Sequence, residues 1–194
     1  QVLAVADNAD YAGNFAQISD DLLSCCLPGP YVAQEIYYGI APYTVVADTK
    51  TAILTAMNAG KLLVNYIGHG ATSVWASESL FTTSSIPSLT NGAKQPIMLP
   101  MTCMDGYFIN PHLYSSNRES LGESLVRADG KGAIASWSPT GYGVASGHDY
   151  LNRAFFNAVF TDGVDTIGEA TLAGKFNLWS AGVSPDLLDT YILF

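Results

Sequence analysis

Two stretches decide the fold of this 194-residue chain: Lys61-Leu-Leu-Val-Asn-Tyr-Ile-Gly-His-Gly70 and Gln95-Pro-Ile-Met-Leu-Pro-Met-Thr-Cys-Met-Asp-Gly-Tyr-Phe108. Each contains a short apolar run, residues 62–64 in the first and residues 97–99 in the second. A short apolar run bounded by Gly or Pro is typical of a strand that is buried on both faces. Such strands occur in parallel sheets with helices on both sides. We therefore predict that both runs are fully buried strands of one parallel sheet.

A reactive side chain follows each of these runs. His69 lies between Gly68 and Gly70, and Cys103 lies three residues before Gly106. In open parallel sheets, the working groups lie in loops at the carboxyl ends of the strands. The sequence therefore predicts that two neighbouring strand ends bring His69 and Cys103 together.

A thiol beside an imidazole is the arrangement of a cysteine nucleophile. A free thiol has a pKa of about 8.5, so little thiolate exists at neutral pH unless a base takes the proton. The same imidazole can then protonate a leaving amine. Gly68 and Gly70 let the backbone approach a substrate, and we expect Gly106 to help Cys103 occupy a tight turn. Amides near Cys103 and Gly70 are therefore candidates to hold a developing oxyanion.

Each of the two residues also has an ordinary structural explanation. A lone Cys after a strand is usually a buried core thiol, and a lone His is usually a hydrogen-bonded structural residue. Here both residues follow a predicted strand and both lie close to glycine. This pairing favours the catalytic interpretation over two independent structural ones.

The motifs resemble those of the gingipain-type cysteine peptidases. Members of that family share an N-Y-x-G-H-G segment, a Trp shortly after it and a C-x-x-G-x-F segment about thirty residues later. The corresponding segments here are Asn65-Tyr-Ile-Gly-His-Gly70, Trp75 and Cys103-Met-Asp-Gly-Tyr-Phe108, and Ser120-Leu-Gly-Glu-Ser-Leu125 is similar to the helix after the family's nucleophile. The resemblance covers residues 1–194 and is most specific over residues 61–108.

This resemblance implies a caspase-like, three-layer α/β/α sandwich with a mostly parallel sheet. It also implies a thiol endopeptidase that passes through a thioacyl-enzyme intermediate and acts on protein or peptide substrates. In that assignment, Cys103 is the nucleophile, His69 is the base, and the amides of Gly70 and Cys103 form the oxyanion hole. The alternative is a caspase-like domain of a cell-surface protein that binds or scaffolds and has lost activity.

Composition limits the class of partner. The chain is 48% hydrophobic and 13% charged, with a net charge of -9, which argues against nucleic acid as a partner because that would require a basic patch. No run approaches the roughly 18 apolar residues of a membrane-spanning helix. We expect residues 1–194 to be a single domain excised from a larger protein. The resemblance implies a secreted or cell-surface location and further domains in the same precursor.

The rest of the chain alternates between strand and helix patterns, which predicts a parallel sheet. Residues 71–92 are rich in Ser and Thr, and we interpret them as a polar connection with a short helix near residues 85–89. Asp48 is the expected N-cap of its helix. The predicted strands are 2–6, 32–38, 61–66, 97–103 and 132–137, with a possible edge strand in 187–194; the predicted helices are 14–26, 49–58, 121–128, 148–160 and 166–179.

A carboxylate that orients His69 would complete a triad. Asp7 and Asp10 follow the first predicted strand and therefore lie at the same sheet edge. We choose Asp10 for this role, with a helix-capping or turn carboxylate as the alternative. The same acidic loop is also a candidate site for a structural calcium ion, although the chain has no EF-hand pattern.

Substrate contacts are assigned to the loop that follows the fifth predicted strand. The resemblance implies that this loop supplies an aromatic side chain to the primary specificity pocket, so Trp137 and Tyr142 are the candidates. Core packing is the default alternative for Trp137. The preference of gingipains for basic side chains requires an acid in that pocket. Asp20, Asp21 and Asp105 are available, and no motif selects one of them: Asp105 also fits a turn position.

The remaining cysteines and histidines have no clear chemical pattern. Cys25 and Cys26 are adjacent in the sequence, and we expect them not to pair with each other because vicinal disulfides are strained. His112 and His148 show no metal-ligand spacing. For both histidines a surface or capping role is the prediction.

Overall fold

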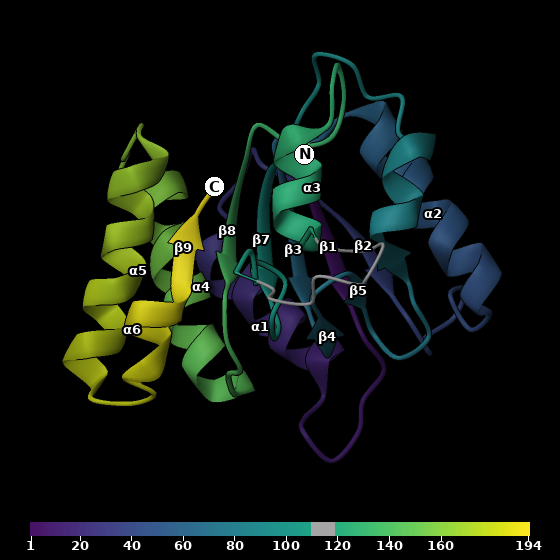
Figure 1. The fold of residues 1–194 in the computed structure, drawn as a ribbon. Coiled ribbons are helices and arrows are strands. Elements are labelled where there is room, and N and C mark those ends of the chain that lie inside the picture. The colour runs from purple at the N-terminus through teal and green to yellow at the C-terminus, as the bar shows by residue number, and fades with distance from the viewer. Residues whose placement is uncertain (110–118) are drawn as a thin grey trace.

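The fold is known from a computed structural model that describes residues 1–109 and 119–194. Its centre is a six-stranded sheet in the order β2-β1-β3-β7-β8-β9, and Figure 1 shows the strands across the view in this order. All neighbouring strands are parallel except β9, which runs antiparallel to β8. The predicted, mostly parallel sheet is confirmed. The strands are β1 (Val2–Ala6), β2 (Ala33–Tyr37), β3 (Leu63–Ile67), β7 (Ile97–Met101), β8 (Ala135–Pro139) and β9 (Tyr191–Leu193).

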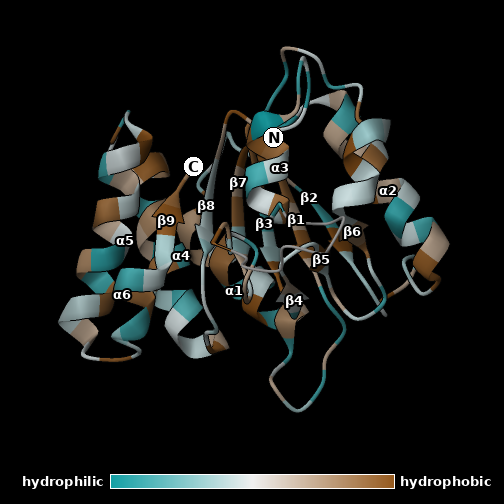
Figure 2. Cartoon of the chain, viewed as in Figure 1, coloured by the Kyte–Doolittle hydropathy of each residue, from teal (hydrophilic) through white to brown (hydrophobic). Residues whose placement is uncertain are grey.

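Helices cover both faces of this sheet, as an alternating burial pattern requires. Val2, Ala4 and Ala6 of β1 pack into one apolar core, whereas Leu3 and Val5 pack into the other. Figure 2 shows hydrophobic residues along β1 and β7 between the two layers. The first layer holds α1 (Phe15–Cys26), α4 (Ala145–Phe160) and α5 (Ile167–Ala181), and the second holds α2 (Val46–Ala59), α3 (Leu121–Arg127) and the 3₁₀ helix η1 (Thr83–Ser88).

Residues 61–70 and 95–108 contain two adjacent strands, β3 and β7. β3 pairs with β7 in parallel, and Ile67 lies opposite Met101. All five residues of β3 are buried, which agrees with a strand covered on both faces. Leu62 was predicted to belong to this buried strand, which is wrong, because Leu62 precedes β3 and is 48% exposed. His69 and Cys103 each follow this pair of opposed residues by two positions, so the predicted juxtaposition of the strand ends is confirmed.

Several element boundaries differ from the predicted ones. Helix α2 begins after Val45, so Asp48 is not its N-cap but an acid of the first turn, where the helix dipole favours it. Strand β8 begins three residues later than predicted, because Ala133 still donates its amide to the carbonyl of Leu125. The final apolar run divides into α6 (Asp186–Thr190) and β9.

Residues 71–92 contain more structure than a polar connection. β4 (Gly70–Ala71), β5 (Val74–Trp75) and β6 (Phe81–Thr82) form a small antiparallel sheet, and η1 follows it. Trp75 is fully buried and stacks on Tyr66, with ring centroids 4.4 Å apart. The segment that follows His69 is therefore anchored to the main sheet.

Cys25 and Cys26 form a disulfide, so our expectation about this pair was wrong. The expectation rested on the usual Cα separation of about 4.4–6.8 Å in bridged cysteines, whereas neighbouring residues are 3.8 Å apart. The pair lies at the last two residues of α1, where the chain leaves helical geometry at Leu27. Cys103 is consequently the free thiol of the three cysteines.

None of the helices in residues 1–109 and 119–194 is long and apolar enough to cross a membrane.

Candidate active site

A hollow of about 320 Å³ lies at the carboxyl ends of β3 and β7, and we call it the strand-end hollow. His69 and Cys103 both line it. The other walls come from the loop between β1 and α1 and from the start of α4. The complete lining is Tyr11, Ala12, Phe15, Ile67, Gly68, His69, Met101, Cys103, Gly143, Val144, Ala145 and His148.

The imidazole of His69 is held from two sides. Its Nε2 atom lies 2.8 Å from Oδ2 of Asp10, and the ring of Phe15 meets the imidazole edge-on at a centroid distance of 5.4 Å. The main-chain amide of His69 donates to Oδ2 of Asp7 at 3.2 Å. One ring nitrogen is therefore occupied by a carboxylate, and Nδ1 is left for another partner.

The carboxylate of Asp10 is held in its charged form. Oδ1 accepts a hydrogen bond from the amide of Ala12 at 2.8 Å, and a backbone bridge to Gly13 closes the loop. The Ala12 hydrogen bond, followed by the one from His69, holds the pKa of Asp10 below its usual value. Asp7 differs, because its burial raises the pKa of that carboxyl. Of the two acids in this loop, Asp10 contacts the imidazole and Asp7 supports the backbone beneath it.

Close packing explains the glycines on both sides of His69. A Cβ atom on Gly68 would collide with the side chain of Asp7 and would lie 2.6 Å from the hydroxyl of Tyr66. A Cβ atom on Gly70 would collide with the hydroxyl of Thr102. Gly68 thus lets the His69 loop lie against Asp7 and Tyr66, and Gly70 lets it lie against Thr102, the residue before Cys103.

Cys103 is half-buried at the start of a tight turn. Its Sγ atom lies 3.6 Å from the carbonyl oxygen of Gly143. The next residue, Met104, has a φ of 60°, a left-handed conformation that is costly for a residue with a side chain and that clusters at functional sites. The amide of Met104 donates to the carbonyl of Gly141 at 2.9 Å, which holds this conformation. Sequence reasoning missed Met104, because methionine carries no turn signal.

Gly106 has a different part in this turn from the one expected. The left-handed residue is Met104, and Gly106 instead lies where a Cβ atom would approach Ser138 to 2.9 Å and Phe194 to 2.8 Å. Its contribution is close packing of the turn against β8.

Asp105 supports the turn from below and does not line the strand-end hollow. Its carboxylate accepts hydrogen bonds from Nε1 of Trp75 at 2.8 Å and from the hydroxyl of Ser138 at 3.0 Å. Burial raises the pKa of Asp105 to about 6. This carboxylate links the small β4–β6 sheet to β8 behind the thiol.

The two aromatic candidates for substrate binding lie apart from the strand-end hollow. Trp137 is fully buried in the core, with its ring 5.7 Å from Phe155 and 5.3 Å from Tyr191. Tyr142 is 77% exposed and is not part of the lining. The loop after β8 does reach the hollow, through Gly143 and the following Val144.

His148 lines the strand-end hollow and is buried, so the predicted surface role is wrong for this residue. It lies in the first turn of α4, is 5% exposed, and its Nε2 atom has no hydrogen-bond partner in the described part of the chain. Burial lowers the pKa of His148 to about 4, so the ring is neutral at neutral pH. An apolar flank at Val144 and Leu151 was the available signal for burial. The other histidine of the sequence analysis, His112, lies outside the described residues.

Within residues 1–109 and 119–194, no group of three or more His, Cys, Asp or Glu side chains is arranged to hold a metal ion.

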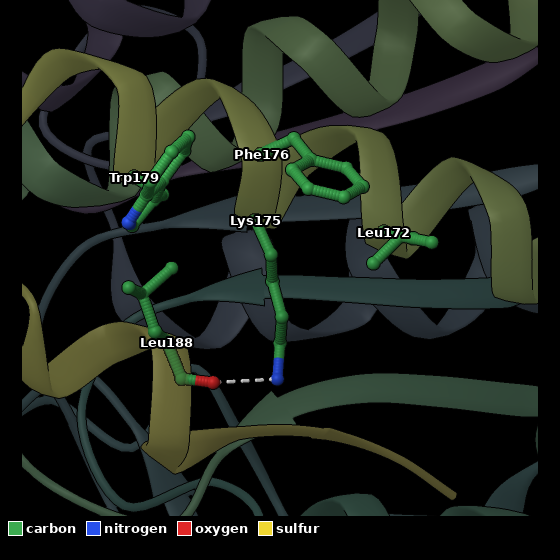
Figure 3. A pocket seen from close by; sticks show the side chains of 5 residues that line it. All are labelled: Leu172, Lys175, Phe176, Trp179 and Leu188. Carbon is green, nitrogen blue, oxygen red and sulfur yellow. Dashed lines mark hydrogen bonds between the residues drawn. The ribbon is translucent and has the colours of Figure 1, made fainter.

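A second hollow, which we call the α5 hollow, lies on the outer face of α5 (Figure 3). Its lining is Leu172, Lys175, Phe176, Trp179 and Leu188. The ammonium of Lys175 donates to the carbonyl of Leu188 at 2.6 Å, so the one charged group here is already engaged.

Comparison with known proteins gives a family and two sets of relatives. The sequence model of peptidase family C25 matches residues 1–194. Gingipain R2 of Porphyromonas gingivalis is 30% identical over 160 residues, which cover 75% of this chain and 20% of the relative. Gingipain R1 of the same species is also 30% identical over 160 residues, covering 75% of this chain and 15% of the relative. The chain thus spans a fifth or less of the length of these relatives.

Solved structures of gingipain share the fold. The crystal structure of the Arg-specific cysteine proteinase gingipain R superposes with a TM-score of 0.77 at 25% identity, covering 100% of this chain and 45% of that one. The complex of the pro- and mature domains of RgpB from Porphyromonas gingivalis gives a TM-score of 0.79 at 25% identity, with 100% and 46% coverage. These similarities confirm the predicted gingipain-like α/β fold.

Proposed function

The chain belongs to peptidase family C25, and on this basis we propose that it is a cysteine endopeptidase that hydrolyses peptide bonds. Cys103 is the nucleophile and His69 is the general base. The single observation that carries this proposal is the strand-end hollow, which His69 and Cys103 line together while Asp10 holds Nε2 of the imidazole at 2.8 Å.

The carboxylate of Asp10 acts as the orienting group. With Nε2 engaged by Asp10, the remaining nitrogen, Nδ1, is the one that takes the proton of the thiol. The ionised carboxylate then stabilises the imidazolium that forms, as the third member of a catalytic triad does. The lowered pKa of Asp10 supports this role, because the charge must be present when the imidazole is protonated.

The chemical steps follow from these positions. The thiolate of Cys103 attacks the carbonyl carbon of the scissile bond, and the developing oxyanion is held by the amides of Gly70 and Cys103. The imidazolium gives its proton to the leaving amine, so the carbon–nitrogen bond breaks and a thioester remains. Water, deprotonated by His69, then cleaves the thioester and restores the thiol. The left-handed turn at Met104 keeps the nucleophile at the mouth of the hollow.

Location and larger context follow the same relatives. We propose a secreted or cell-surface protein in which residues 1–194 are one domain of a longer precursor. Tyr142 remains a proposed substrate contact, on the loop that leads to Gly143, whereas Trp137 is buried in the core and is not proposed as one. A structural calcium ion stays a proposal, and the carboxylates of Asp7 and Asp10 that would bind it are both engaged by groups of the protein.

A labelling experiment tests the proposal and separates it from a catalytically silent binding domain. The chain is treated with iodoacetamide under non-reducing conditions, and modification of Cys103 is followed by mass spectrometry beside hydrolysis of a mixed peptide library. We expect rapid labelling of Cys103, loss of hydrolysis on labelling, and slow labelling in His69→Ala. Labelling that is as slow as that of a denatured control, together with no hydrolysis, would favour the binding domain.

A further inference from the structure

Beyond the two reactive groups, the wall of the strand-end hollow is mostly apolar, and Tyr11 and His148 are the further lining residues with a polar side-chain atom. Phe15, Ile67 and Met101 line it from α1, β3 and β7, and Val144 and Ala145 close it at the start of α4. These residues come from four separate segments, so the apolar character of the wall does not result from the periodicity of a single helix. A volume of about 320 Å³ gives room for a single large side chain beside the thiol.

No residue with a carboxylate lines this hollow among those that the structure describes. The three acids that the sequence offered for a basic side chain are elsewhere: Asp20 and Asp21 are exposed on α1, and Asp105 is buried against Trp75 and Ser138. Asp10 faces the imidazole and the Ala12 amide. A buried cation in the hollow would therefore lose its water without gaining a charged partner, which is strongly unfavourable.

The polar group at the back of the hollow does not change this balance. The imidazole of His148 is buried and lies against Gly143, where a Cβ atom would collide with its Nε2 atom. Because burial lowers the pKa of His148 to about 4, the ring carries no charge at neutral pH. It therefore supplies no positive charge for an acidic side chain and no negative charge to balance a basic one.

We infer that the strand-end hollow receives a neutral, apolar side chain from the residue before the scissile bond, and that it rejects arginine and lysine. This inference rests on the proposed peptidase function. It sets the chain apart from the structurally similar gingipain R, which is described as Arg-specific. The substrate class is thus a peptide with a residue such as leucine, methionine or phenylalanine at the cleavage position.

The test is a series of peptides that differ only at that position, carrying Leu, Met, Phe, Gln, Arg, Lys or Asp. We expect kcat/KM for the three apolar residues to exceed that for Arg and Lys by roughly 100-fold, a difference of the size that pocket contacts provide. Chloromethyl ketones of the Leu and Arg peptides, with modification of Cys103 read by mass spectrometry, report the same preference when turnover is slow.

A matched pair of variants tests the physical cause. Ala145 is the first residue of α4, where an acid is compatible with the helix dipole. Ala145→Asp adds a carboxylate to the wall and should raise the Arg-to-Leu ratio of kcat/KM by about 10-fold or more. The isosteric, neutral Ala145→Asn should leave that ratio close to the wild-type value.

The outcomes separate the two claims. A wild-type preference for Arg or Lys, or an unchanged ratio in both variants, overturns this inference and leaves the peptidase function standing. An absence of hydrolysis with every peptide, together with no ketone labelling of Cys103, overturns the peptidase function and this inference with it.

Discussion

The strand-end hollow and the α5 hollow have the same volume, about 320 Å³ each, and both have largely apolar walls. They differ in what converges on them. A thiol and an imidazole meet at the first, with a carboxylate outside the lining holding the imidazole, whereas the second offers one ammonium that already donates to the carbonyl of Leu188. Volume and apolarity therefore do not identify an active site, and the convergence of reactive groups does.

The difference has its origin in topology. The lining of the strand-end hollow is collected from four segments, because parallel strands deliver their loops to a single edge of the sheet. The α5 hollow is lined by one helix and its neighbour α6, with Leu172, Phe176 and Trp179 on one outer face of α5. Helical periodicity alone produces such a face.

Removal of the thiol should have the largest effect on turnover. It should also show most clearly that the two hollows differ in function. We expect Cys103→Ala to lower kcat by at least about 10⁴-fold, because the covalent route is lost. Trp179→Ala, in the α5 hollow, should leave kcat within about twofold, as expected for a side chain that is exposed and remote from the chemistry. Peptide hydrolysis by matched preparations measures both. Wild-type turnover in Cys103→Ala would exclude this residue as the nucleophile.

Two tryptophans, Trp137 in the core and Trp179 in the α5 hollow, should differ in their contribution to stability. Trp137 is fully buried between Phe155 and Tyr191, so Trp137→Ala should lower the free energy of unfolding by about 3–5 kcal/mol. Trp179 is 67% exposed, and Trp179→Ala should cost less than about 1 kcal/mol. Urea unfolding curves compare them. Equal losses would mean that the α5 face is covered in solution.

Removing the charge of Asp10, the partner of the imidazole, should lower activity less than removing the nucleophile. Asp10→Asn keeps the shape of the side chain and removes its charge, so we expect kcat/KM to fall by about 100-fold while His69→Ala approaches the loss in Cys103→Ala. The combination of His69→Ala with Cys103→Ala should be little worse than either single change. If Asp7→Asn proves more damaging than Asp10→Asn, the orienting carboxylate is assigned to the wrong residue.

The region beneath the strand-end hollow should also carry a pH-dependent part of the stability. Burial raises the pKa of Asp105 from 3.8 to about 6 in the folded chain. The stabilising contribution of this group to the free energy of unfolding is therefore fully present below pH 3.8 and is lost as pH rises through about 6. Relative to Asp105→Asn, the wild-type free energy of unfolding should therefore fall by on the order of 2 kcal/mol between pH 4 and pH 7.

The contribution of His148 to the free energy of unfolding has the opposite pH dependence. Comparing the wild type with Asp105→Asn removes this contribution from the result. The pKa of His148 is lowered from 6.5 to about 4, so its contribution is present above pH 6.5 and is lost as pH falls toward 4. Both proteins retain His148, and its effect cancels in the difference between them. A difference in unfolding free energy that stays constant from pH 4 to pH 7 would contradict the assignment for Asp105.

The sequence by itself determined the scaffold of the site. The apolar runs before His69 and Cys103 predicted two buried strands, and the strand–helix alternation predicted a parallel sheet that brings their ends together. These inferences succeeded because hydrophobic periodicity reports directly on burial, and because parallel strands leave little freedom in where their loops emerge. The motif around these residues also pointed to the family that the whole chain matches.

Only the tertiary structure decided how the site is completed. The contact between Asp10 and His69 joins residues that are 59 positions apart, the left-handed turn falls on a methionine, and His148 becomes a neutral wall residue through burial. The vicinal disulfide was equally outside local prediction, whereas the burial of Trp137 agrees with the core packing that is the default for this residue type. Local patterns encode period and propensity, whereas the partner of a loop side chain, its conformation and its charge depend on segments that meet only after the sheet and both helical layers have assembled.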